Sequence, residues 1–229
     1  MLVIEGKIKT NELFSGIDSP DNCKDKKHFD SYNKEVTYNY NSRGFRDSDW
    51  PEDLSNVVWC VGDSFTVGLG QPFEETWPQV LGRKLGKRCI NVGEDGASND
   101  RIQSRVNEII EKHNPGLIVV MWSYLHRRFV NGENVHHSRN DFGAVKDMEN
   151  FVRNYELCDK KTKIVHSIIP LGSSPTGWTY VLQKHNIHDM IVFPQLDYSR
   201  DYHHFDIKTS EFATDLMIEK INAVDKKPK

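Results

Sequence analysis

The sequence has no excess of charge of either sign. Its 229 residues include 30 lysines and arginines against 33 aspartates and glutamates, which gives a formal net charge of −3 at pH 7. Proteins that bind nucleic acids or anionic membranes do so largely through clustered positive charge. The balanced composition therefore predicts neither a nucleic-acid partner nor a membrane partner.

Long apolar runs and paired cysteines are also missing. No apolar run approaches the length that spans a bilayer, and the N-terminus shows no basic stretch followed by a long apolar core, as a signal peptide would. The four cysteines form no Cys-x-x-Cys pair, which argues against a zinc ribbon or a thioredoxin-like site. We therefore expect a globular protein of a reducing compartment, the cytoplasm.

Two cofactor motifs are absent as well. There is no Gly-x-Gly-x-x-Gly, which argues against a nucleotide-binding flavodoxin-like protein, and no His-Glu-x-x-His. The histidine pairs 136–137 and 203–204, with nearby acids, leave a metal hydrolase as an alternative without a supporting spacing. We expect neither a cofactor nor a metal ion.

What the sequence does contain is an alternation of apolar strands and amphipathic helices. Strands are predicted at residues 57–61, 88–92, 117–122, 163–169 and 190–193, and helices at 76–86, 98–113, 144–157, 178–185 and 209–224. The strand at 117–122 is apolar throughout, which indicates burial on both faces. The pattern predicts a doubly wound α/β sandwich around a central parallel five-stranded sheet.

The remaining segments are polar. Residues 1–55 are interpreted as an N-terminal extension packed on a main domain of residues 56–225, with a short strand at 35–40 where apolar and polar residues alternate. Residues 123–142 are long and polar and are expected to cross the edge of the sheet where ligands bind.

The first predicted strand ends abruptly at Gly62-Asp63-Ser64. Glycine lets the backbone turn sharply there, and a serine at the end of a buried strand is directed out of the sheet edge, where a nucleophile needs to be. An ordinary strand-to-helix turn uses the same residue types. The second half of the pattern lies near the end of the chain, where Asp201 and His204 share the loop before the last helix. His204 could act as the base that a serine nucleophile requires, with either Asp201 or a backbone carbonyl orienting it.

Taken together, these residues resemble a known family. Gly62-Asp63-Ser64 after the first strand, Gly96 after the second, and Asp201-x-x-His204 before the last helix resemble the first, second and fifth blocks of the SGNH (GDSL-type) hydrolases. The runs 41–46, 62–68 and 75–78 resemble a subgroup of that superfamily. The resemblance implies a flavodoxin-like α/β/α fold and hydrolysis of esters, among them acetylated sugars, lipids and thioesters.

The resemblance also implies roles for single residues. Ser64 would be the nucleophile, His204 the general base and Asp201 its partner. The backbone N–H groups of Ser64 and Gly96 would form part of the oxyanion hole, which stabilises the negative charge that develops in the transition state.

The third block of the family is altered. The family usually has Gly-x-Asn-Asp after the third strand, and the asparagine completes the oxyanion hole, whereas residues 121–124 here read Met-Trp-Ser-Tyr. Ser123, Tyr124 or Asn99 could supply the missing donor. The candidates for contact with the substrate are Asp63, Trp122, Tyr124 and Arg127.

Three functions fit this pattern. The first is a serine esterase acting on a small-molecule or carbohydrate ester, with O-acetyl groups on a carbohydrate as the favoured substrate. The second is an O-acyltransferase that uses the same three residues. The third is a catalytically weak or inactive binding protein on the same scaffold, because the third-block asparagine is missing.

Overall fold

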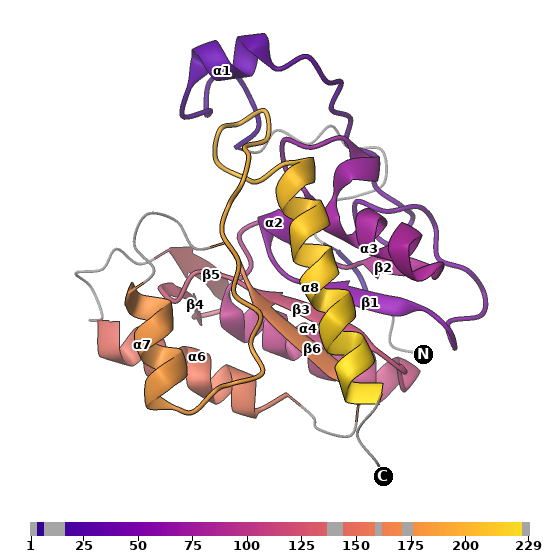
Figure 1. Cartoon of the computed structure of the whole chain (residues 1–229), viewed down its shortest axis with the longest axis vertical. Coiled ribbons are helices and arrows are strands. Elements are labelled where there is room, and N and C mark those ends of the chain that lie inside the picture. Colours follow the sequence, from indigo (N-terminus) through magenta and orange to yellow (C-terminus); the bar gives the residue numbers. More distant parts are fainter. Residues whose placement is uncertain (1–3, 7–16, 137–143, 159–161, 171–175, 226–229) are drawn as a thin grey trace.

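A parallel sheet lies at the centre of the chain (Figure 1), for which the computed structural model describes residues 4–6, 17–136, 144–158, 162–170 and 176–225. The strands of the sheet run in the order β2-β1-β3-β6. They are β1 (Val58–Val61), β2 (Cys89–Asn91), β3 (Ile118–Trp122) and β6 (Ile164–Ile168). Because β1 lies between β2 and β3, the strand order reverses beside β1, and ligands bind at such positions in open α/β sheets.

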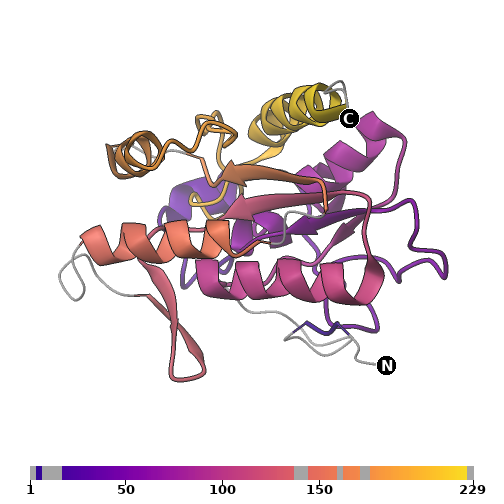
Figure 2. The same ribbon diagram turned by 90° about the horizontal axis from the view of Figure 1, so that it is seen from below.

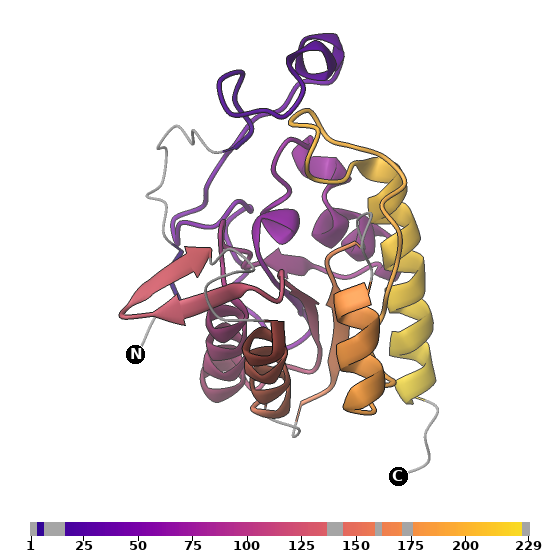
Figure 3. The same ribbon diagram turned by 90° about the vertical axis from the view of Figure 1, so that its left-hand side faces the viewer.

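Helices cover both faces of the sheet (Figure 3), so the predicted three-layer α/β/α architecture is confirmed. One face carries α3 (Trp77–Leu85) and α8 (Ile207–Asp225), and the other carries α4 (Asn99–His113) and α6 (Ala144–Glu156), against which α7 (Thr176–Lys184) packs. Of the helices that the structure describes, none pairs sufficient length with the apolar character that crossing a bilayer requires.

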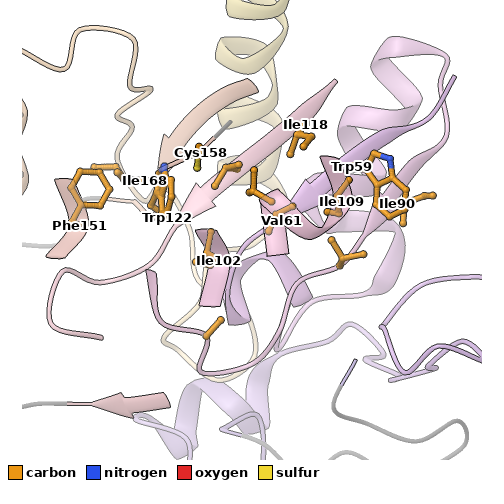
Figure 4. Close-up of a cluster of buried hydrophobic side chains, with 14 of the residues drawn as sticks. Trp59, Val61, Ile90, Ile102, Ile109, Ile118, Trp122, Phe151, Cys158 and Ile168 are labelled. Atoms are coloured by element: carbon orange, nitrogen blue, oxygen red, sulfur yellow. The ribbon is translucent and has the colours of Figure 1, made fainter. Parts of the chain in front are cut away.

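Strand residues alternate between two apolar layers. Trp59 and Trp122 are fully buried in the layer beneath α4 and α6, where Phe151 also packs (Figure 4). Cys60 and Met121 point to the opposite layer, beneath α3 and α8. Burying a large apolar side chain stabilises a fold by about 1.5–3 kcal/mol, so the continuous apolar run of β3 contributes on both faces.

The prediction of a fifth strand at 190–193 is wrong, because the residues that the structure describes form a sheet of four strands. Within the described part of the chain, one parallel bridge between Ser167 and Ile191 attaches this segment to β6. Ile191 N donates to His166 O at 2.8 Å, and Ile168 N donates to Ile191 O at 3.2 Å. Val192 is exposed, and Pro194 has no N–H to extend a ladder.

The described residues 17–56 are largely extended and contact the segment that follows α2 (Ser64–Val67). They contain α1 (Lys26–Ser31), but residues 35–40 form no strand, which corrects the prediction made from their alternation. Arg46, 1% exposed, donates to Thr37 O at 2.8 Å, to Gln71 O at 2.7 Å and to Gly68 O. The alternation therefore reflects an extended chain lying on a surface and not a paired strand.

A β-hairpin stands out from the domain within residues 123–142, the polar segment predicted to cross the edge of the sheet (Figure 2). It consists of β4 (Arg127–Val130) and β5 (Glu133–His136). Phe129 N donates to Asp100 Oδ2, and Asn134 Oδ1 accepts from Ser98 N, both at 3.1 Å. These bonds attach the hairpin to the N-terminal end of α4, while residues 137–142 lie outside the described part of the chain.

Gly62, which follows β1, has no room for a side chain. An added Cβ would lie 2.1 Å from Thr66 Oγ1 and 2.8 Å from Met121 O, whereas a Cβ at Gly116 would meet nothing within 4 Å. We expect Gly62→Ala to lower the free energy of unfolding by about 1–3 kcal/mol, because the backbone must shift. Gly116→Ala is the matched control and should be neutral or slightly stabilising. Urea denaturation measures both, and equal stability of the two variants would contradict the prediction.

Candidate active site

Ser64 lies in the turn that follows β1. Asp63 caps the short helix α2 (Ser64–Val67), and its Oδ1 accepts a hydrogen bond from Phe65 N at 3.0 Å. The helix ends at Gly68, whose φ of +78° is a left-handed conformation that favours glycine. The turn thus holds Ser64 as the first helical residue at the carboxyl edge of the sheet, with 2% of its surface exposed.

His204 reaches Ser64 from the loop that precedes α8. The distance between His204 Nε2 and Ser64 Oγ is 2.8 Å, across 140 residues of sequence. His204 Nδ1 lies 2.6 Å from Asp201 Oδ2. When the Nδ1 proton is directed at Asp201, Nε2 is left as the acceptor for the serine hydroxyl. The structure therefore brings together the three residues for which the sequence predicted catalytic roles, and the roles themselves remain predictions.

The carboxylate of Asp201 is fully buried and bonded by its own loop. Its Oδ1 accepts from Ser199 Oγ at 2.9 Å, His203 N at 2.9 Å and His204 N at 3.0 Å. Burial by itself would raise the pKa of Asp201, but its pairing with the His204 ring and the hydrogen bonds from His204 N and His203 N lower it well below its usual range. Asp201 thus stays ionised beside the imidazole. Ser199 was not among the predicted site residues, and no local sequence signal marked it.

Asp63 does not face a substrate site, contrary to the prediction. It is fully buried, and its Oδ2 accepts from Ser123 Oγ at 2.5 Å and from Arg127 Nη1 at 2.8 Å. Arg127 is therefore paired with a carboxylate. A buried carboxylate is costly unless it is paired and hydrogen-bonded, which explains why both donors converge on it.

Two of the three candidate replacements for the third-block asparagine, Asn99 and Ser123, are hydrogen-bonded to one another. Asn99 Oδ1 accepts from Ser123 N at 2.9 Å, and Asn99 Nδ2 donates to Tyr124 O at 3.1 Å. The hydroxyl of Ser123 is already bonded to Asp63. In this arrangement Asn99 and Ser123 hold the loop after β3 in place, and neither directs a donor toward Ser64.

The ring of Tyr124, the third candidate, also lies beside the serine turn. Its ring centroid is 6.3 Å from that of Phe65 and 6.4 Å from that of His203. Burial raises the pKa of Tyr124 to about 12, so the hydroxyl remains a donor at neutral pH. Among the described residues, this hydroxyl has no hydrogen-bond partner. Trp122, in contrast, is fully buried against Phe151 and does not reach the site, because it faces the opposite apolar layer.

The loop between β2 and α4 carries Gly96, which has a φ of +69°. This loop packs directly on α2, since a Cβ added at Gly93 would lie 2.7 Å from Val67 N. Gly96 is thus on the same edge of the sheet as Ser64. Among the residues that the structure describes, no cluster of three or more histidine, cysteine, aspartate or glutamate side chains is placed to hold a metal ion, and His137 lies outside them.

The chain is similar to known proteins in its structure but not in its sequence. No protein-family model matches the chain, and no curated protein sequence matches it. A carbohydrate esterase family 2 enzyme with a carbohydrate-binding domain, from Corynascus thermopiles (Myceliophthora fergusii), has a TM-score of 0.53 at 13% identity, over 80% of this chain and 69% of its own. TesA has a TM-score of 0.51 at 14% identity, over 72% of this chain and 97% of its own.

A family two carbohydrate esterase from Clostridium thermocellum, solved in complex with cellohexaose, is similar to the same extent. Its TM-score is 0.50 at 17% identity, over 76% of this chain and 66% of that chain. At these identities the likeness concerns the fold. The chain has the fold of the SGNH (GDSL-type) hydrolases, as the motifs predicted.

His203 makes the stability of this site depend on pH. Burial lowers its pKa from 6.5 to about 3, and the neighbouring His204 adds to the effect. Below pH 6.5 the His203 side chain binds a proton in the unfolded chain but stays neutral in the folded chain. The free energy of unfolding therefore falls as the pH falls from 6.5 toward 3. His166, whose pKa burial lowers to about 4, acts in the same direction. His203→Gln should reduce the number of protons taken up on unfolding in this range by up to about one.

Urea denaturation of both proteins between pH 4 and 7 measures this difference. An identical slope in wild type and His203→Gln would show that His203 binds its proton in the folded state as well.

Proposed function

We propose that this chain is a serine esterase of the SGNH type that hydrolyses a carboxylic ester. The observation that carries the proposal is the continuous hydrogen-bonded series from Ser64 Oγ through the His204 ring to Asp201, with distances of 2.8 and 2.6 Å. A hydroxyl, an imidazole and a buried carboxylate in this order form the arrangement that activates a serine nucleophile. The SGNH fold supports the same assignment.

The proposed reaction has two halves. Ser64 Oγ attacks the carbonyl carbon of the ester while His204 Nε2 accepts the hydroxyl proton, and His204 then gives this proton to the departing alcohol. Water attacks the resulting acyl-serine, again with His204 as base, and releases the carboxylic acid and free Ser64. Asp201 keeps the imidazole in the required tautomer and stabilises its protonated form.

The oxyanion hole is proposed to use the backbone N–H groups of Ser64 and Gly96 and the hydroxyl of Tyr124. Ser123 and Asn99 support the loop instead, because their polar atoms are bonded to Asp63 and to the loop backbone. Tyr124 directly follows Ser123, packs beside the serine turn and retains its proton at neutral pH. It is therefore the best-placed side chain for the part that asparagine plays in the family.

The substrate class proposed is an O-acetylated carbohydrate. The similar structures include carbohydrate esterases, one of them solved in complex with cellohexaose. The half-buried rings of Tyr124 and His203 stack beside the serine turn, and flat rings of this kind suit the apolar face of a sugar. Arg127, which Asp63 neutralises, does not favour an anionic substrate.

A non-catalytic binding protein is the second candidate. The specific observation in its favour is that the third block contributes Ser123, whose hydroxyl is committed to Asp63, in place of an asparagine. A folded protein whose Ser64 does not react with a fluorophosphonate probe would support this candidate against the esterase.

Replacement of Ser64 tests the esterase directly. Ser64→Ala should lower the rate of p-nitrophenyl acetate hydrolysis by more than about a thousand-fold, because the nucleophile is lost. Ser104→Ala, at an exposed position in α4, is the matched control and should keep the wild-type rate. Mass spectrometry should map the fluorophosphonate adduct to Ser64. Retained activity in Ser64→Ala would exclude Ser64 as the nucleophile.

Tyr124→Phe tests the third oxyanion donor. Loss of one such donor costs about a hundred- to a thousand-fold in kcat, and we expect a loss at the lower end because two backbone donors remain. Tyr180→Phe, which removes the hydroxyl of an exposed tyrosine in α7, should leave kcat unchanged. Comparable kcat values for Tyr124→Phe and wild type would assign the donor to another group.

A further inference from the structure

The loop that carries Asp201 and His204 is held from outside by the N-terminal segment. Asp18 accepts two hydrogen bonds from Arg200, one from Nε at 2.9 Å and one from Nη2 at 2.7 Å. The Asp18 side chain is fully buried, and Arg200 directly precedes Asp201. A bidentate arginine–carboxylate pair fixes both the distance and the orientation of the two side chains, so the pair restrains the backbone next to Asp201.

Tyr38 extends this ion pair to the turn after α2. Its hydroxyl donates to Asp18 Oδ2 at 2.5 Å and accepts from Gly70 N at 2.7 Å. Gly70 O in turn accepts from Arg200 N at 3.1 Å. Burial raises the pKa of Tyr38 well above its usual range, so the phenol stays protonated and keeps both bonds. The four residues form a closed ring of hydrogen bonds that joins the segment after Ser64 to the loop of His204.

A second contact reaches the same loop from α1, which lies beside it in Figure 1. His28 Nε2 is 2.9 Å from Ser199 O. Ser199 is fully buried, donates through Oγ to Asp201 and donates through its backbone N–H to His204 O at 2.8 Å. The N-terminal segment therefore reaches this loop by two separate contacts. Asp18 binds Arg200, the residue before Asp201, and His28 contacts Ser199, which is hydrogen-bonded to both Asp201 and His204.

We propose that Asp18 and Tyr38 are positioning residues, which set the Asp201–His204 loop at the correct distance from Ser64; the proposal rests on the esterase function proposed above. The loop needs such a restraint because its tyrosines, Tyr198 and Tyr202, are exposed and do not anchor it in the core. Catalytic groups lose efficiency steeply when they move by a fraction of an ångström to an ångström.

Asp18→Asn tests the ion pair, since it removes the charge and keeps the size of the side chain. We expect kcat on p-nitrophenyl acetate to fall roughly ten- to a hundred-fold, with KM changed by less than about twofold. Tyr38→Phe, which breaks the ring at one bond, should lower kcat in the same direction by less. Asp215→Asn is the matched control, because it removes the ion pair with Lys84 between α3 and α8 and should leave kcat unchanged.

Hydrogen–deuterium exchange gives a second readout that needs no catalysis. The amides of Ser199, His203 and His204, all hydrogen-bonded in the loop, should exchange faster in Asp18→Asn and at the wild-type rate in Asp215→Asn. If the wild type hydrolyses no ester, the proposed function fails and exchange alone decides whether Asp18 positions the loop. Wild-type exchange in this loop, or wild-type kcat, in Asp18→Asn would overturn the proposal. If Asp18→Asn does not fold, Tyr38→Phe decides by the same two measurements.

Discussion

The hydrogen bond between Ser64 and His204 joins two turns that are 140 residues apart in sequence. A parallel sheet allows this contact, because strands that run in the same direction deliver the loops that follow them to one edge. Phe65 and Phe205, the neighbours of these two residues, have ring centroids 5.4 Å apart and belong to the apolar layer beneath α3 and α8. The core and the candidate site therefore share the apolar layer beneath α3 and α8.

Two fully buried aspartates, Asp63 and Asp201, organise the site, and different groups compensate the burial of each charge. Asp63 relies on residues from after β3, because Ser123 and Arg127 converge on one of its oxygens. A charge so placed must be paired, since an unpaired buried carboxylate costs several kcal/mol. Ser123 and Arg127 thus support the serine turn through their hydrogen bonds to Asp63.

Sequence predicted those features that local pattern determines. The apolar run of β3 and the turn at Ser64 were evident because burial on both faces and a sharp turn restrict residue type. The direction of Trp122 could not be predicted, because a continuous apolar run does not reveal which face each residue takes. The hairpin of β4 and β5 and the contact between Asp18 and Arg200 also escaped prediction. The latter spans 182 residues and leaves no periodic signal in either segment.

Two carboxylates organise the backbone of the loop before α8. Asp197 accepts from the backbone N–H groups of Asp206 and Thr209, both at 3.1 Å, and so fixes the loop to the first turn of α8. Asp201 accepts from two backbone N–H groups of its own loop and from the His204 ring. The same negative charge therefore shapes the backbone and orients the imidazole. Because an ionised acceptor makes stronger hydrogen bonds than a neutral one, removal of the Asp201 charge should weaken the backbone turn at residues 201–204 and the orientation of the base together.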